Sequence, residues 1–157
     1  MSNASLISEK LRSIIGKELP TLTQVTELDR RLVANFIEAI EDPNSVWETE
    51  DFMERTKREA TVPSSILWTA GVSYKGRVLA PFLSELPQNG VDAGGDWEIF
   101  KPVKVGDVIT ARTKLSEVYE RESKSMGKML MVITETTYTN QKGEVVGTYK
   151  HNMLRYK

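Results

Sequence analysis

The spacing of apolar and polar residues changes partway along this chain. In the first 70 or so residues, apolar side chains recur at helical intervals. Later runs alternate apolar and polar positions and are rich in Val, Ile, Thr, Tyr and Trp, as β-strands are. The predicted helices span 5–15, 27–41 and 50–59, with another short piece from Pro63; the predicted strands lie near 77–83, 95–101, 107–119, 129–139 and 144–156. Helices followed by a long antiparallel run predict an α+β domain.

The segment 27–41 is the strongest predicted helix. Thr26 and Asp29 stand at capping spacing before it, and its apolar residues occupy more than half of its circumference. Several of the predicted strands exceed the usual length of ~5–6 residues. We therefore expect a long sheet that wraps around this helix.

Composition indicates a single globular domain. The 157 residues are enough to bury a core, and we find no repeat or linker that would divide 5–157. Residues 1–4 are expected to be a vector-derived remnant or disordered. Hydrophobic residues make up 39% of the chain and charged residues 27%, with a formal net charge of -1. This balance gives no strong field to gather nucleic acid or an anionic membrane, so neither is an expected partner.

The residue types present exclude several chemistries. The chain has no cysteine, so disulfides, a thiolate nucleophile and sulfur-ligated metals are excluded. His151 is the only histidine, which excludes a multi-histidine metal site, and no acidic loop has the spacing of an EF-hand. No apolar run approaches the ~20 residues that span a bilayer. With no secretory signal either, we expect a cytoplasmic protein without a bound metal.

Three local motifs carry a resemblance to a known family. The segment Glu41–Trp47 (EDPNSVW) stands where MaoC-like hydratases have Gly-Asp-x-Asn-Pro-Ile-His. Gly94–Asp107 and Glu135–Val146, with His151 after them, are similar to the FAS1-like dehydratase type. Over residues 14–156 the chain resembles this MaoC-like group of the hot-dog superfamily. The resemblance implies a single hot-dog domain, a dimer, and acyl substrates carried as thioesters on coenzyme A or acyl carrier protein, with no other cofactor.

The resemblance also suggests site residues. Asp42 takes the place of the family's catalytic aspartate and Asn44 that of its asparagine, although both residue types also simply shape turns. Trp47 stands in place of the catalytic histidine, and an indole N–H only donates hydrogen bonds, so it cannot accept a proton. Trp47 either closes the substrate tunnel or packs against a neighbouring subunit, or it is an ordinary core or groove aromatic.

Two further features have a structural and a functional interpretation. Ser64 and Ser65 follow Pro63 and could present backbone N–H groups to a thioester oxygen; the simpler interpretation is helix capping. By alternation, His151 shares one side of the last strand with Tyr149 and Met153. For His151, a hydrogen-bonded structural role is favoured over a catalytic one.

The missing histidine decides the preferred function. Hydration of an enoyl thioester needs a base, an acid and donors to the thioester oxygen. We therefore expect a catalytically incomplete, substrate-shaping subunit of a two-component hydratase/dehydratase, paired with a catalytic MaoC-type chain. Two alternatives remain: a homo-oligomer that binds acyl-CoA or another small apolar ligand without catalysis, and a thioesterase in which Asp42 activates water.

Overall fold

A computed structural model describes residues 5–42, 61–71, 84–125 and 127–157. The helices are α1 (Glu9–Ile14), α2 (Arg30–Ile40) and α4 (Leu67–Ala70), with a 3₁₀ turn η1 (Ser64–Ile66) directly before α4. The strands are β1 (Glu18–Glu27), β2 (Thr61–Val62), β3 (Asn89–Ile99), β4 (Val103–Lys104), β5 (Val108–Ser123), β6 (Gly127–Thr139) and β7 (Val145–Tyr156).

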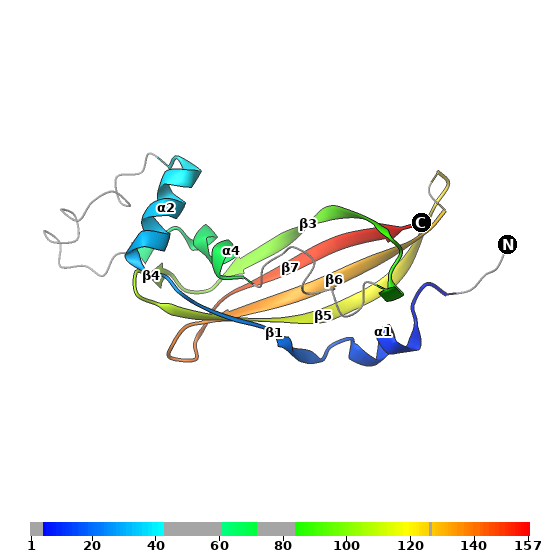
Figure 1. The fold of residues 1–157 in the computed structure, drawn as a ribbon, viewed down its shortest axis with the longest axis horizontal. Coiled ribbons are helices and arrows are strands. Elements are labelled where there is room, and N and C mark those ends of the chain that lie inside the picture. Colours follow the sequence, from blue (N-terminus) through cyan, green and yellow to red (C-terminus); the bar gives the residue numbers. More distant parts are fainter. Residues whose placement is uncertain (1–4, 43–60, 72–83, 126) are drawn as a thin grey trace, which may run out of the picture.

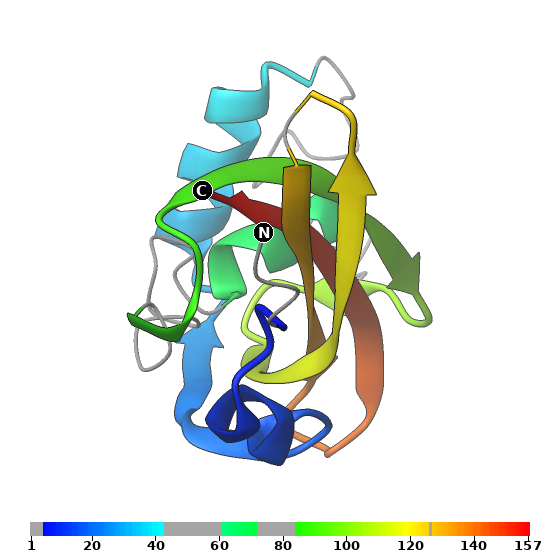
Figure 2. The same ribbon diagram turned by 90° about the vertical axis from the view of Figure 1, so that its right-hand side faces the viewer.

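A long, curved antiparallel sheet dominates the molecule (Figure 1). Its strand order is β1-β5-β6-β7-β3, so β1 and β3 form the two edges; β2 and β4 pair separately. The strands β5, β6 and β7 follow one another as a meander, and Figure 2 shows the sheet curling around α4. The predicted α+β class, a long antiparallel sheet around a helix, is confirmed.

Three of the predicted strands are longer in the structure. Strand β3 begins six residues before the predicted 95–101, β5 continues through Ser123, and β6 begins at Gly127. Strand β1 was not predicted. The predicted strand at 77–83 and the predicted helix at 50–59 lie outside the described residues.

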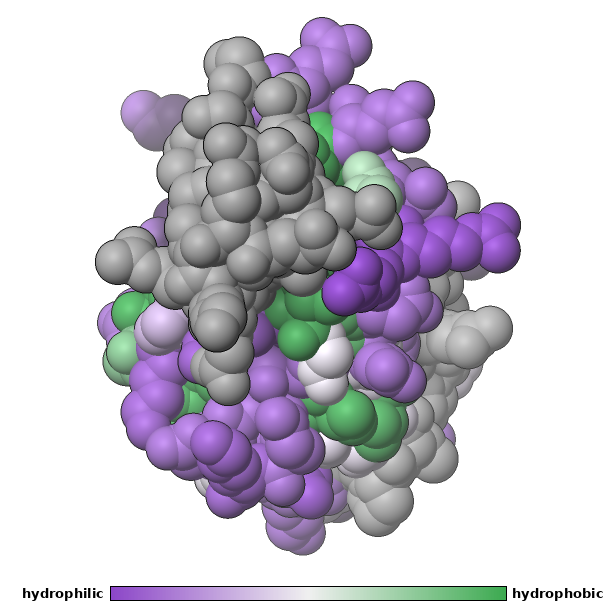
Figure 3. All heavy atoms as spheres, turned by 90° about the vertical axis from the view of Figure 1, so that its left-hand side faces the viewer, coloured by the Kyte–Doolittle hydropathy of each residue, from purple (hydrophilic) through white to green (hydrophobic). Residues whose placement is uncertain are grey.

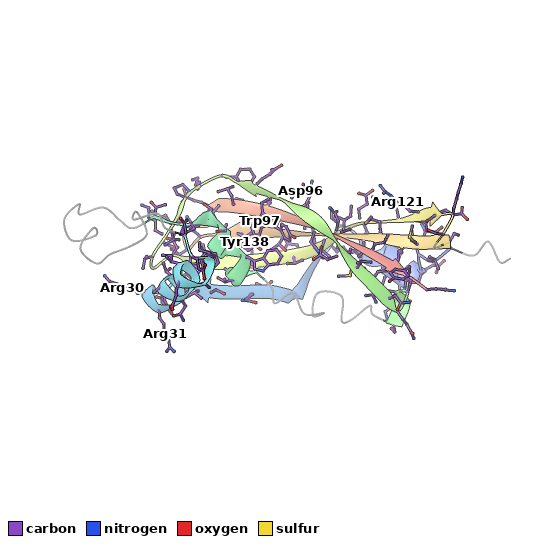
Figure 4. All side chains as sticks on the ribbon, turned by 90° about the horizontal axis from the view of Figure 1, so that it is seen from above. Arg30, Arg31, Asp96, Trp97, Arg121 and Tyr138 are labelled. Carbon is purple, nitrogen blue, oxygen red and sulfur yellow. The ribbon has the colours of Figure 1, made fainter. Side chains whose placement is uncertain are left out.

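The prediction that the sheet wraps around 27–41 is wrong. Helix α2 begins at Arg30, where the Asp29 carboxylate accepts the first-turn N–H of Leu32 at 2.8 Å. Of this helix only Val33 is buried, and the helix lies toward one end of the sheet (Figure 1). Arg30 and Arg31 point away from the sheet (Figure 4). The helix inside the curve is α4, which contacts β1 and β5.

The buried face of the sheet carries two apolar clusters. The aliphatic cluster lies under α1 and consists of Leu11, Leu86, Leu115, Val118, Leu130 and Val132. The second cluster joins α2, η1 and α4 to the sheet and includes Val33, Ile66, Leu67, Ala70, Tyr138 and Tyr149. Tyr149 and Met153 are on the same side of β7, and one packs in each cluster. Both clusters therefore occupy the same face of the sheet, side by side.

Candidate functional site

Four aromatic rings gather between α4 and the sheet. We call Trp68, Trp97, Tyr138 and Tyr149 the aromatic cluster. Trp97 on β3 stacks on Tyr149 of β7 with ring centroids 4.6 Å apart, and on Tyr138 of β6 at 5.3 Å. Trp68 of α4 meets Tyr149 edge-on at 5.3 Å. Figure 4 shows Trp97 and Tyr138 turned toward each other. Such offset and edge-on contacts add stability beyond the area that the rings bury.

The strand register explains why these rings meet. Trp97 and Tyr149 are Cα partners in the β3–β7 ladder, and Tyr149 is the partner of Thr136 in β6. Gly95 leaves room for the ring of Tyr149, because a Cβ there would lie 2.5 Å from the tyrosine Oη. In the same row, Thr113 and Thr136 share a buried hydrogen bond of 2.8 Å. The row is therefore closely packed, and its threonine hydroxyls are satisfied.

Burial fixes the protonation state of the two tyrosines. Burial, reinforced by neighbouring Tyr149, raises the pKa of Tyr138 far above its usual value. The pKa of Tyr149 is also raised, first by burial and then by the charges of Asp92 and Asp96. Both phenols stay neutral at physiological pH, so they can donate hydrogen bonds but do not act as bases.

The histidine lies next to this cluster, at the junction with the aliphatic cluster. His151 is 5% exposed, and its Nε2 lies 3.2 Å from Oδ1 of Asp92 on β3. Its ring is 6.0 Å from that of Tyr149. The same Asp92 oxygen accepts the backbone N–H of Gly94 at 2.7 Å. The hydrogen bond that we expected for His151 is present, and it ties β7 to the edge strand β3.

The residues predicted for the site fall on separate elements. Asp42 is half-buried just beyond Glu41, the left-handed residue that ends α2. Ser64 and Ser65 form η1, which leads into α4; neither side chain caps the helix, so the capping interpretation is not supported. Asn44 and Trp47 lie outside the described residues. The catalytic and binding roles of all five residues remain predictions.

We next describe the other surface features of the described part of the chain. An open groove of about 480 Å³ lies beside the aliphatic cluster, lined by Leu6, Ser84, Glu85, Leu86, Pro87, Gln88, Asn89 and Lys157. Within the described ranges there is no group of three or more residues suited to hold a metal ion, and no helix long and apolar enough to cross a membrane. At the end of the molecule that carries α2, apolar residues surface in patches among hydrophilic ones (Figure 3).

A long antiparallel sheet that curves around a short helix is the arrangement of a hot-dog fold. The chain belongs to the family described as "FAS1-like, dehydratase domain region", whose model matches residues 13–149. This assignment rests on most of the chain, so it does not depend on which helix the sheet surrounds.

Individual proteins show the same likeness. A protein of Thermomonospora curvata named "Probable enoyl-CoA hydratase alpha subunit" is 26% identical over 141 residues, which cover 80% of this chain and 44% of that protein. The chain thus spans less than half the length of this relative.

Solved structures share the fold at low identity. The HadBC (3R-hydroxyacyl-ACP dehydratase) complex of Mycobacterium tuberculosis has a TM-score of 0.63 at 19% identity, covering 87% of this chain and 92% of that chain. The (R)-hydratase of A. caviae involved in PHA biosynthesis has a TM-score of 0.63 at 19% identity, covering 91% and 96%.

Proposed function

We propose that this chain is the substrate-shaping subunit of a two-component acyl-thioester hydratase/dehydratase, and that a MaoC-type partner supplies the complete acid–base pair. The observation that carries the proposal is Trp47, which stands where the family's catalytic histidine would be. An indole cannot accept the proton that is transferred in the hydration or dehydration of an acyl thioester.

The described residues add support from chemistry. His151 does not replace the missing group, because it is buried and its Nε2 already faces the Asp92 carboxylate. The aromatic cluster offers neutral phenols and indole N–H groups, which bind and orient but do not abstract protons. On this proposal these groups help to shape the acyl site, and the reacting proton is moved by the partner's residues.

Two of the proteins reported above also support a role within an assembly. One bears the name of an alpha subunit, and the other is a complex of two chains. On this proposal the acyl group arrives as a thioester of coenzyme A or acyl carrier protein, and no further cofactor takes part. Asp42 and Asn44 would contribute to catalysis at the positions of the family's aspartate and asparagine, and Ser64 or Ser65 would present a backbone N–H to the thioester oxygen.

The test is an enoyl-thioester hydration assay. The chain is expressed alone and together with a MaoC-type hydratase encoded beside it, and the hydration of 2-butenoyl-CoA is followed by the loss of its conjugated absorbance. We expect turnover only from the pair. Turnover by this chain alone, undiminished in Asp42→Ala, would contradict the proposal.

Two other outcomes identify the alternatives. Release of free coenzyme A without hydration would indicate thioesterase action. Binding of acyl-CoA in calorimetry, with no turnover in the presence of any partner, would indicate a ligand-binding homo-oligomer.

A further inference from the structure

Trp68 lies at the open end of the aromatic cluster. It is 48% exposed, whereas Tyr138 and Tyr149 are 2% and 8% exposed. The ring centroid of Trp68 is 5.3 Å from that of Tyr149 and 6.2 Å from that of Trp97. One part of the indole therefore rests on more deeply buried rings, and the other part remains accessible.

The helix that carries this indole is held close to the sheet. Its residues Ile66, Leu67 and Ala70 are buried in the cluster that joins the helices to the sheet. Gly147 on β7 leaves room for the helix, because a Cβ there would lie 3.3 Å from Cδ1 of Leu67 and 3.2 Å from Cδ1 of Ile99. Ile99, which is 44% exposed, therefore lies beside α4, the helix inside the curve of the sheet in Figure 2.

Trp68 and Ser65 lie on the same side of this helical segment. Both are exposed, and residues 66 and 67 between them are buried. Side chains three residues apart on a helical turn are neighbours, with Cβ atoms roughly 5–6 Å apart. In the proposed function the thioester oxygen lies at the backbone N–H of Ser64 or Ser65. A substituent on the β-carbon of that enoyl thioester is then within reach of the indole.

An exposed indole favours an aromatic group over an alkyl group. Both kinds of group gain from the removal of apolar surface from water. An aromatic ring gains further from offset or edge-on contact with the π system of the indole. The aliphatic cluster offers burial alone, since all of its buried members are leucine or valine. The aromatic cluster is therefore the part of the buried face that distinguishes a ring from a chain.

We infer that Trp68 is a specificity-determining residue of the acyl site, and that the preferred substrate is an enoyl thioester whose β-carbon carries an aromatic ring. The ring of the substrate packs on the exposed part of the indole and extends the row of rings formed by Trp97 and Tyr149. Ile99 contributes an aliphatic contact at its side. This inference rests on the proposed function for the position of the thioester, and it adds the class of acyl group.

The test compares two thioesters that differ only in whether their ring is aromatic, 3-phenylpropanoyl-CoA and 3-cyclohexylpropanoyl-CoA. Neither has the reacting double bond, so binding is measured without hydration. Isothermal titration calorimetry gives the dissociation constant of each, for the chain alone and for the chain co-expressed with the MaoC-type hydratase encoded beside it. We expect the phenyl compound to bind about fivefold more tightly than the cyclohexyl compound.

Variants of Trp68 connect this preference to the indole. Trp68→Leu keeps an apolar side chain without a π system and should bind both thioesters equally, whereas Trp68→Phe keeps a ring and should retain a preference. The matched control is Phe100→Leu, which removes a ring that is 55% exposed and outside the aromatic cluster. This control should keep the wild-type preference. Circular dichroism verifies folding, and Trp68→Met replaces Trp68→Leu if the latter is unfolded.

Three results would overturn the inference. These are equal affinities of the wild type for the two thioesters, no binding of either by the chain or the pair, and a preference that survives in Trp68→Leu. The outcome is separate from that of the hydration assay. A phenyl preference without turnover by the pair would contradict the proposed function and leave the inference standing, and turnover without a preference would do the reverse.

Discussion

The two clusters on the buried face of the sheet differ in the types of side chain they contain. Under α1 the buried cluster is entirely aliphatic, and five of its six residues come from α1, β5 and β6, with Leu86 from the segment before β3. Under α4 aliphatic residues still predominate, but the rings of the aromatic cluster join them beside the exposed edge of β3, and Trp68 remains 48% exposed. Aliphatic side chains pack densely without direction, whereas rings and hydroxyls stack and donate hydrogen bonds. We therefore expect the aliphatic half to depend on close packing alone and the aromatic half to depend also on the orientation of its rings.

The largest expected effect breaks the aliphatic half. Leu130 is fully buried there, and Leu130→Ala leaves a cavity in addition to the lost burial. We expect a loss of about 2–5 kcal/mol in the free energy of unfolding, measured by urea denaturation. If the halves are independent, the near-ultraviolet circular dichroism of the aromatic cluster should persist wherever the variant remains folded. A variant that keeps its stability would show that this half is not the stabilising one.

A smaller effect is expected from the aromatic half, at Gly95. In Gly95→Ala the new methyl group meets Tyr149 Oη at 2.5 Å and also the carbonyl oxygen of Lys150, so the backbone or the ring must move. We expect a loss of about 1–3 kcal/mol in stability. Near-ultraviolet circular dichroism should change as well, because Trp97 loses its stacking on Tyr149.

The control lies on the same strand. In Gly90→Ala the methyl group meets Nη1 of Arg155 at 2.5 Å, but this is the far end of a flexible side chain that can swing away. Gly90→Ala should therefore cost less than Gly95→Ala and leave the aromatic spectrum unchanged. Equal costs would mean that the stacked row imposes no special requirement on β3.

Much of the sheet could be predicted from the sequence, because alternation survives in long strands. The ranges 107–119, 129–139 and 144–156 overlap almost entirely with β5, β6 and β7, and the shared side of Tyr149, His151 and Met153 is confirmed. Strand β1 was missed because the residues around Pro20 were interpreted only as an extended link; proline is tolerated on an edge, and β1 is an edge strand.

The central helix could not be chosen correctly by pattern strength alone. The segment 27–41 has the clearest helical period, but Arg30, Arg31 and Glu38 on one side fit a helix that faces water. The helix that the sheet surrounds, α4, has four residues, too few to show a period. Length therefore favoured the wrong segment, while burial depends on topology.

Even less of the candidate site could be predicted from the sequence. The motif comparison directed attention to Asp42, whereas the aromatic cluster joins Trp68, Trp97, Tyr138 and Tyr149 from four elements. Their meeting depends on the cross-strand register and on the bulge before Gly95, which no local pattern specifies. A glycine pair, Gly94-Gly95, inside a strand pattern was the available signal, since such glycines mark bulges and close approaches.

The smallest effect concerns the rim of the aliphatic half, where Glu120 holds the N-terminal segment. Its carboxylate accepts the backbone N–H of Leu6 and the hydroxyl of Ser5 at 2.9 Å, and it pairs with Lys128 at 3.0 Å. The hydrogen bond from Lys128 first, and those from Leu6 and Ser5 next, lower the pKa of Glu120 to about 2. A carboxyl group whose pKa is lower in the folded than in the unfolded state stabilises the fold above its unfolded pKa. This contribution is lost as the pH falls through about 2.

Glu120→Gln should therefore lower Tm slightly at pH 7, and the difference from wild type should shrink on acidification toward pH 2. Since the site is solvent-exposed, added salt should reduce the same difference. A difference in Tm that stays constant between pH 7 and pH 2 would show that Glu120 acts by shape rather than by charge. The stability of the aliphatic half would then not depend on the charge of Glu120.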